Sequence, residues 1–170
     1  MGVAAPSCSV RTVVDVARVP NGMAWTLDAR TLFWIDSATQ CVEAFDWDGQ
    51  HGALSNRRTV VTVPKQGAGV HGLIGGIPDG CTIDAAGKLW VALAESGCVV
   101  QYDPETQRQL AAVQLPVQRP TACTFGGADL SELYCTTREE GAGGAMHSGG
   151  LFRVRIPGVK GLHGAYPFSG

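Results

Sequence analysis

The sequence predicts an all-β protein, and three observations support this prediction. The apolar runs are only four to seven residues long and are rich in β-branched and aromatic residues, which is typical of strands. No stretch keeps the apolar period of about 3.6 residues that an amphipathic helix needs. The chain of 170 residues contains 23 glycines and 9 prolines, a composition that indicates many turns between short strands.

One sequence pattern occurs three times, and an internal repeat of this kind indicates a repeated structural unit. Each copy has a proline, a polar residue and a Gly or Ala, followed by an alternating run. A turn comes next, and a second run then begins with Leu and an aromatic residue. The copies are Val19–Ser37, Ile77–Ser96 and Arg119–Thr137. Two more strand-like runs follow each of the first two copies, and a looser match at Leu151–Val154 follows the third.

Four antiparallel strands in about 40–55 residues is the period of a propeller blade. We therefore expect a β-propeller, with blades at about 19–63, 77–115 and 119–168, and a segment 1–9 outside it. The run Arg11–Val16 is predicted to be an orphan strand from a further blade. Asp28–Arg30 and Asp84–Gly87 are predicted hairpin turns, because Asp caps the backbone in such turns. The glycine-rich stretch Gly67–Gly76 is predicted to be an inserted loop.

The number of blades does not fit a closed ring. Propellers close with about four or more blades, whereas this sequence supplies about three. The chain is therefore expected to form part of a ring, with exposed sheet edges. We expect self-association as one way to cover these edges.

Composition excludes several classes of partner. The formal net charge is −2 and no basic run occurs, so neither nucleic acid nor an anionic membrane is an expected partner. No apolar window is long enough for a membrane helix, and the N-terminus does not resemble a signal peptide. The six cysteines form no CxxC pair, so we expect free thiols and a cytoplasmic protein.

The repeat predicts a site at the mouth of the channel. In each copy one polar residue follows the proline of the innermost strand: Asn21, Asp79 and Thr121. A ring of blades brings these positions together near one axis. Amide, carboxylate and hydroxyl oxygens are the ligands that Ca²⁺, Mg²⁺ and Mn²⁺ prefer, so a divalent metal site is predicted there. Asx-turn capping is the alternative for Asn21 and Asp79.

Three further residues are predicted at the same rim. The second strand of each blade is antiparallel to the first, so its end returns to the channel mouth. This places Asp36, Glu95 and Arg138 at the rim or behind the metal ligands. The alternative for each of them is a solvated strand end. A GxSxG elbow, a phosphate-binding GK[ST] loop and an HExxH motif do not occur in the sequence.

Several motifs resemble the regucalcin (senescence marker protein) / gluconolactonase family. They include Pro20–Trp25 followed by Leu27-Asp28, and they continue through most of the chain. The others are Ile35–Ser37, Ser55–Arg58, Ile77–Gly80, Asp84–Ala92 and Gly149–Phe152. The resemblance implies a six-bladed propeller that holds one divalent metal ion (calcium, zinc, manganese or magnesium) and hydrolyses sugar lactones such as gluconolactone.

The resemblance also implies roles for two residues. Asn21 and Asp79 match two metal ligands of the family, and Asp79 also matches its candidate general base. A third ligand, a glutamate near the family's N-terminus, has no counterpart here, and neither do substrate-binding residues from the family's first half. The sequence therefore resembles the C-terminal half of a member.

Three functional interpretations follow. The first is a metal-dependent lactonase that needs partner blades, which a second copy of the chain could supply. The second is a non-catalytic calcium-binding or protein-interaction remnant of a propeller. The third is an incomplete product that does not fold stably.

Overall fold

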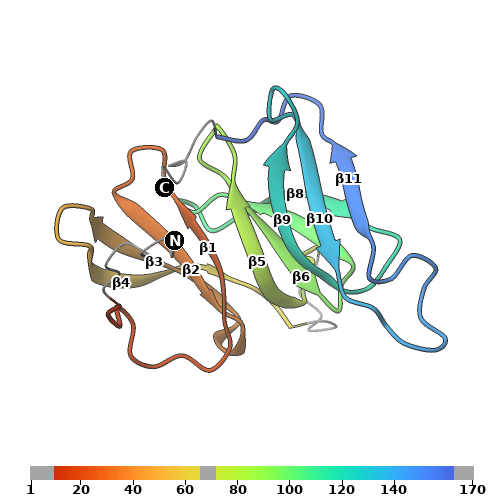
Figure 1. Cartoon of the computed structure of the whole chain (residues 1–170), viewed down its shortest axis with the longest axis horizontal. Helices are drawn as coiled ribbons and strands as arrows, with labels where there is room; N and C mark the ends of the chain where they lie inside the picture. The colour runs from red at the N-terminus through yellow and green to blue at the C-terminus, as the bar shows by residue number, and fades with distance from the viewer. Residues whose placement is uncertain (1–9, 66–71, 163–170) are drawn as a thin grey trace, which may run out of the picture.

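The computed structural model describes residues 10–65 and 72–162, and it confirms the all-β prediction. The described residues form three antiparallel sheets that stand side by side in an open arrangement, the partial propeller that was expected (Figure 1). The first sheet has the order β1–β2–β3–β4, with bounds Pro20–Trp25, Thr31–Asp36, Cys41–Asp48 and Ala53–Thr62. The second has the order β5–β6–β7–β8, with bounds Ile77–Ile83, Leu89–Ala94, Cys98–Tyr102 and Gln109–Gln114. The third consists of β9, β10 and β11, with bounds Pro120–Gly126, Glu132–Thr137 and Leu151–Arg155.

Parts of three predicted segments lie outside the described residues. They are the N-terminal segment 1–9, the glycine-rich loop up to residue 71, and the last predicted blade from residue 163 onward.

The middle sheet is buried on both faces because it lies between the other two. On one face, Leu89 and Val91 pack with Val42 of the first sheet. On the other face, Trp90 packs with Leu133 of the third sheet. Successive strand residues point to opposite faces, so a strand buried on both sides must be apolar throughout. This explains why β6 has the continuous apolar sequence LWVALA.

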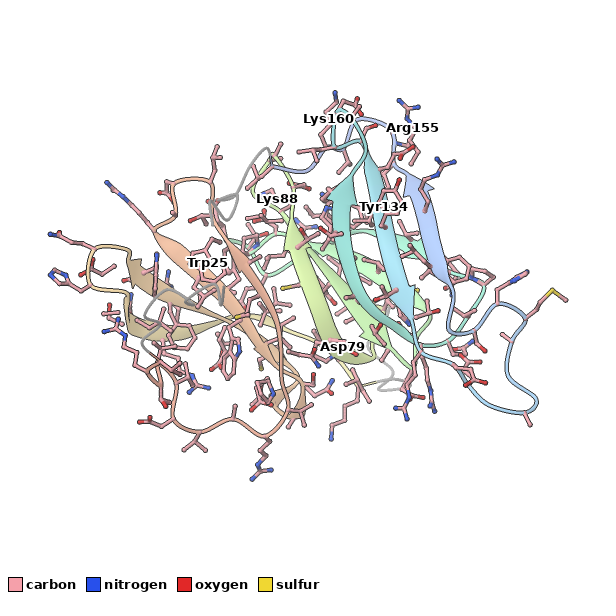
Figure 2. The ribbon with its side chains drawn as sticks, viewed as in Figure 1. Trp25, Asp79, Lys88, Tyr134, Arg155 and Lys160 are labelled. Carbon is pink, nitrogen blue, oxygen red and sulfur yellow. The ribbon has the colours of Figure 1, made fainter. Side chains whose placement is uncertain are left out.

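The two outer faces of the arc differ in chemistry. On the first sheet, Leu32, Trp34 and Phe45 form an apolar cluster that faces away from the middle sheet. On the third sheet, Tyr134 donates a hydrogen bond of 2.8 Å to Glu132, and Arg153 forms a 3.5 Å ion pair with the same carboxylate. The outer face of the third sheet is therefore polar, and Tyr134 is labelled on it in Figure 2.

The predicted orphan strand Arg11–Val16 is not a strand in the structure; its backbone is irregular. A strand needs a neighbour for its backbone N–H and C=O groups, and the described residues do not include the sheet that this segment would join. The segment still packs through Val14 against the apolar cluster of Leu32 and Trp34. The strand that the alternating sequence predicts at this segment is therefore not found in the structure.

Candidate metal centre

Asn21 and Asp79 both lie in β-bulges at the start of innermost strands. In the first sheet the pairing register shifts between Pro20 and Met23, so Asn21 and Gly22 fall inside the shift. In the second sheet the same shift lies between Pro78 and Cys81 and includes Asp79. Proline has no N–H to give to a ladder and is tolerated at such irregular positions. A bulge re-aims side chains, and here it frees the polar residue after each proline from regular pairing.

Glycine allows these two bulges to approach each other. A Cβ atom on Gly22 would lie 2.6 Å from the backbone N of Cys81 and 2.7 Å from the carbonyl oxygen of Asp79. Real Cβ atoms essentially never approach other atoms so closely, so only glycine fits here. The glycine that follows the polar residue of the repeat therefore determines how near β1 can lie to β5, and with it how near Asn21 can lie to Asp79.

The side chains of Asn21 and Asp79 interact with each other. The Asn21 side chain donates a hydrogen bond to the Asp79 carboxylate, and Asn21 Nδ2 also donates to Ser37 Oγ at 3.1 Å. Asp79 is half-buried at the start of β5 (Figure 2). Desolvation raises the pKa of its carboxyl, although hydrogen bonds from Asn21 and from the Gly80 backbone act in the opposite direction. Burial thus outweighs the compensation that these donors give to the negative charge.

The side-chain oxygens of Asn21 and Asp79 fit a hard divalent cation as two of its ligands. An amide oxygen and a carboxylate oxygen suit such an ion, and Asp79 has no ion-pair partner among the described residues. The described residues contain no group of three or more His, Cys, Asp or Glu side chains that could hold a metal. The remaining ligands would therefore be water or groups from outside this part of the chain.

Thr121 occupies the matching position of the third sheet, but its hydroxyl is engaged elsewhere. Its Oγ1 lies 2.9 Å from Thr136 Oγ1 on the neighbouring strand. Its carbonyl oxygen lies where the second and third sheets meet, 2.8 Å from the position that a Cβ atom on Gly80 would take. The structure thus brings Asn21 and Asp79 together, while Thr121 hydrogen-bonds within its own sheet.

The three predicted rim residues have different surroundings. Glu95 forms a 3.2 Å ion pair with Arg119, which links the second and third sheets. Arg138 is exposed, and its backbone N–H donates to the carbonyl of Arg119. Asp36, in contrast, is only 3% exposed.

Asp36 holds the neighbouring backbone in place at the end of the first sheet where Asn21 lies. Its carboxylate accepts backbone hydrogen bonds from Arg18 at 3.0 Å, Val19 at 2.9 Å and Ala38 at 3.2 Å. The bond from Arg18 is the largest cause that lowers the pKa of this carboxyl. Asp36 also caps the short 3₁₀ turn Ser37–Thr39. Its role in this structure is therefore to hold backbone in place behind Asn21.

Sequence reasoning missed Ser37, the residue that contacts Asn21 from behind. Ser37 is 6% exposed and follows Asp36 directly. The available signal was the Asp-Ser-Ala-Thr sequence after β2, because Asp before a short turn is a capping pattern. That signal indicates a turn but says nothing about the direction of the serine hydroxyl.

A family described as SMP-30/Gluconolactonase/LRE-like region matches residues 3–139. The chain belongs to this family. Regucalcin of Gallus gallus is 42% identical over 170 residues, which covers 97% of this chain and 54% of that protein. The chain therefore spans about half the length of the curated relatives it matches. The family resemblance inferred from the sequence motifs is confirmed.

Two solved structures of family members share the fold of this chain. One is a calcium-binding protein, regucalcin, of Agrobacterium tumefaciens, with a TM-score of 0.71 and 25% identity, covering 85% of this chain and 48% of that one. The other is a gluconolactonase of Xanthomonas campestris, with a TM-score of 0.62 and 28% identity, covering 85% of this chain and 40% of that one. Among the described residues, no helix is long and apolar enough to cross a membrane.

Proposed function

We propose that this chain binds one divalent cation through Asn21 and Asp79 and supplies this part of a site that hydrolyses sugar lactones. The observation that carries the proposal is the close approach of β1 and β5 at Gly22, which brings Asn21 next to the half-buried Asp79, together with the hydrogen bond from the Asn21 side chain that acts on the pKa of the Asp79 carboxyl. Two relatives support it through their names, since one is called calcium-binding and the other a gluconolactonase. Calcium, zinc, manganese and magnesium all accept such ligands.

The chemistry requires a water molecule to add to the lactone carbonyl. A bound cation would polarise that carbonyl and stabilise the negative charge that develops on its oxygen. Asp79 would accept the proton of the attacking water. The new C–O bond forms at the carbonyl carbon, the ring C–O bond breaks, and the leaving alkoxide takes up a proton to give the hydroxy acid. Asn21 would keep a neutral oxygen beside the carboxylate, so that only one negative charge needs to be held at this point.

Cation binding without catalysis is a second candidate function. It is favoured because the described residues give the cation only two protein oxygens, and affinity for hard cations depends on the number and charge of the ligands. We also propose that a second copy of the chain, or the rest of a ring, covers the open sheet edges. Free thiols at the described cysteines support our expectation of a cytoplasmic protein.

Metal titration and lactone hydrolysis separate these functions. Binding of Ca²⁺, Mn²⁺ and Zn²⁺ would be measured by calorimetry, and gluconolactone hydrolysis by acid release at constant pH with each metal added. We expect Asp79→Ala to abolish both binding and hydrolysis. The control is Asp103→Ala, which removes a carboxylate that is paired with Lys88 at 3.0 Å outside the site.

Each outcome has a defined meaning. Metal binding without hydrolysis would favour the second candidate function over the first. Activity that survives Asp79→Ala would show that the site is wrongly assigned. Sedimentation of the chain tests whether a second copy covers the open sheet edges. A monomer at all concentrations would exclude self-association.

A further inference from the structure

Ser37 lies directly behind the Asn21 amide. Asn21 Nδ2 donates to Ser37 Oγ at 3.1 Å, and Ser37 is 6% exposed. The contact joins the bulge of β1 to the turn that follows β2. Among the described residues, Ser37 is the only side chain besides Asp79 that is found to hydrogen-bond the Asn21 side chain.

The contact with Asp79 sets which way the amide faces, and the contact with Ser37 holds the side chain in place. An asparagine amide has two N–H donors on nitrogen and one acceptor oxygen. The Asp79 carboxylate takes one donor, and Ser37 Oγ takes the other. The amide oxygen is then the part of Asn21 left without a partner in this pair of contacts. A rotation of the amide by 180° would turn its oxygen toward the Asp79 carboxylate, which only accepts when ionised, so that hydrogen bond would be lost. The Ser37 hydroxyl both donates and accepts, so it can hold the Asn21 side chain in either orientation.

Ser37 can hold the amide because its own backbone is held. The Ser37 N–H donates to the Val19 carbonyl at 3.0 Å, and the Ser37 carbonyl accepts from Gln40 at 3.3 Å. Asp36, one residue earlier, binds three backbone N–H groups around the same turn. The Ser37 hydroxyl therefore belongs to a turn that is hydrogen-bonded to Val19, the residue directly before the strand that carries Asn21.

We propose that Ser37 is a positioning residue for the cation site, which holds the Asn21 side chain in place beside Asp79. This inference rests on the proposed function, because it assumes that Asn21 and Asp79 bind a cation. Groups that orient metal ligands from behind are typically worth 10–100-fold in metal affinity. Ser37 contributes one neutral hydrogen bond to one of two ligands, so we place its effect at the low end of this range.

The second sheet provides a matched control. Ser96 follows β6 as Ser37 follows β2, but its hydroxyl donates to the carbonyl of Leu93 at 2.7 Å and accepts from the N–H of Cys98 at 3.2 Å. Ser96 thus stabilises its own turn and contacts neither Asn21 nor Asp79. The two serines occupy corresponding positions in the repeat, but only Ser37 reaches a candidate ligand.

The experiment measures Ca²⁺ and Mn²⁺ affinity of the full chain by calorimetry, together with urea unfolding of each variant. We expect Ser37→Ala to weaken binding about tenfold, and Ser37→Thr, which keeps the hydroxyl, to restore most of the loss. Ser96→Ala should lower the unfolding midpoint but leave the affinity within about twofold. If Ser37→Ala and Ser96→Ala weaken binding equally, the effect of Ser37 is merely structural and the proposal is wrong.

A double-mutant cycle tests whether Ser37 acts through Asn21. Asn21→Ala removes the side chain that Ser37 contacts. In that background Ser37→Ala should change the affinity by less than about twofold, because no side chain is left for Ser37 to hold. A full tenfold loss there would show that Ser37 acts on another group and would overturn the proposal.

The same data separate this inference from the function on which it rests. If the unmodified chain binds neither ion, the proposed cation site itself fails. If it binds and Asp79→Ala abolishes binding, but Ser37→Ala binds as the unmodified chain does, the site stands and only the role of Ser37 is refuted.

Discussion

The two ends of β5 each carry an aspartate, and the two carboxylates have opposite surroundings. Asp84, directly after the strand, is 2% exposed. Its carboxylate accepts four hydrogen bonds of 2.7–2.9 Å, from the backbone of Ala86 and Lys88, the indole of Trp90 and the amide of Gln101. Within the part of the chain that the structure describes, Asp79, at the start of the strand, receives hydrogen bonds from the Asn21 side chain and the Gly80 backbone, and burial raises its pKa.

This difference distinguishes a structural carboxylate from a candidate ligand. A buried carboxylate is tolerated when enough N–H donors replace the water it has lost. Asp84 has these donors and holds the hairpin turn between β5 and β6 together. Asp79 loses water without the same compensation, so a cation is the partner that would balance it.

Removal of Asp84 should have the largest effect on stability. Asp84→Ala leaves the indole N–H of Trp90, which is fully buried, without its acceptor. Each buried donor left unsatisfied costs about 1–3 kcal/mol, so we expect a loss of about 3 kcal/mol or more in the free energy of unfolding. Urea denaturation measures it. The control is Asp28→Ala in the matching turn of the first sheet, where the aspartate is exposed; equal losses in the two variants would contradict the comparison.

Gly80→Ala should come next, because it disturbs the Asp79 end of the strand without altering the carboxylate. A Cβ there would lie 2.6 Å from Ala122 Cα and 2.8 Å from the Thr121 carbonyl oxygen. Forcing a methyl group into such a contact typically costs about 1–3 kcal/mol. Gly49→Ala is the control, because its nearest contact would be 3.4 Å. If thermal unfolding shows the same midpoint for both variants, the close joint between the second and third sheets is not as described.

Asp79→Asn should change metal-free stability by less than about 1 kcal/mol, since it removes a desolvated charge and keeps the shape. Its effect should be on metal linkage. Added Ca²⁺ stabilises a protein whose folded state binds it, so calcium should raise the unfolding midpoint of the unmodified chain but not that of Asp79→Asn. Urea unfolding with EDTA and with excess Ca²⁺ gives both quantities. A large loss of stability with EDTA would mean that Asp79, like Asp84, is structural.

The smallest effect is expected at Asp129, an exposed aspartate near the Asp84 end. The Ser131 hydroxyl and the Lys160 ammonium hold the pKa of Asp129 below its usual value, and the Lys160 carbonyl accepts the N–H of Ala85 beside Asp84. A lowered folded-state pKa contributes stability above the ordinary aspartate pKa of about 4, and this contribution is lost as pH falls through the folded value.

Asp129→Asn removes that contribution at all pH values. The difference in unfolding midpoint between the unmodified chain and the variant should therefore be small at pH 6 and shrink toward pH 2. A difference that grows as the pH falls would contradict the assigned partners.

Much of the fold could be predicted because its information is local. Strand runs, prolines before the bulges and Asp-rich turns can each be recognised from neighbouring residues, and the three copies supported one another. The segment Arg11–Val16 shows the limit of this reasoning. Its alternating sequence favours a strand, but a strand forms only beside another strand, and the sequence of the segment does not contain that neighbour.

The candidate site was predictable only in part, for the same physical reason. The repeat placed Asn21 and Asp79 at equivalent positions, so their proximity followed from ring geometry. Asp36 and Ser37 depended on side-chain direction within a turn, which the repeat does not determine. Asp84 was predicted as a turn cap, but its bonds to Trp90 on β6 and Gln101 on β7 connect the turn to two strands and could not be inferred from the turn sequence.

Glycine follows the polar residue in the first two copies of the repeat, whereas Ala122 takes that place in the third. A Cβ atom on Gly22 or on Gly80 would lie 2.6 Å from the neighbouring strand, so these glycines let β1 approach β5, and β5 approach β9, closely. A strand that packed against the other side of β9 would meet the methyl group of Ala122 and could not approach as closely.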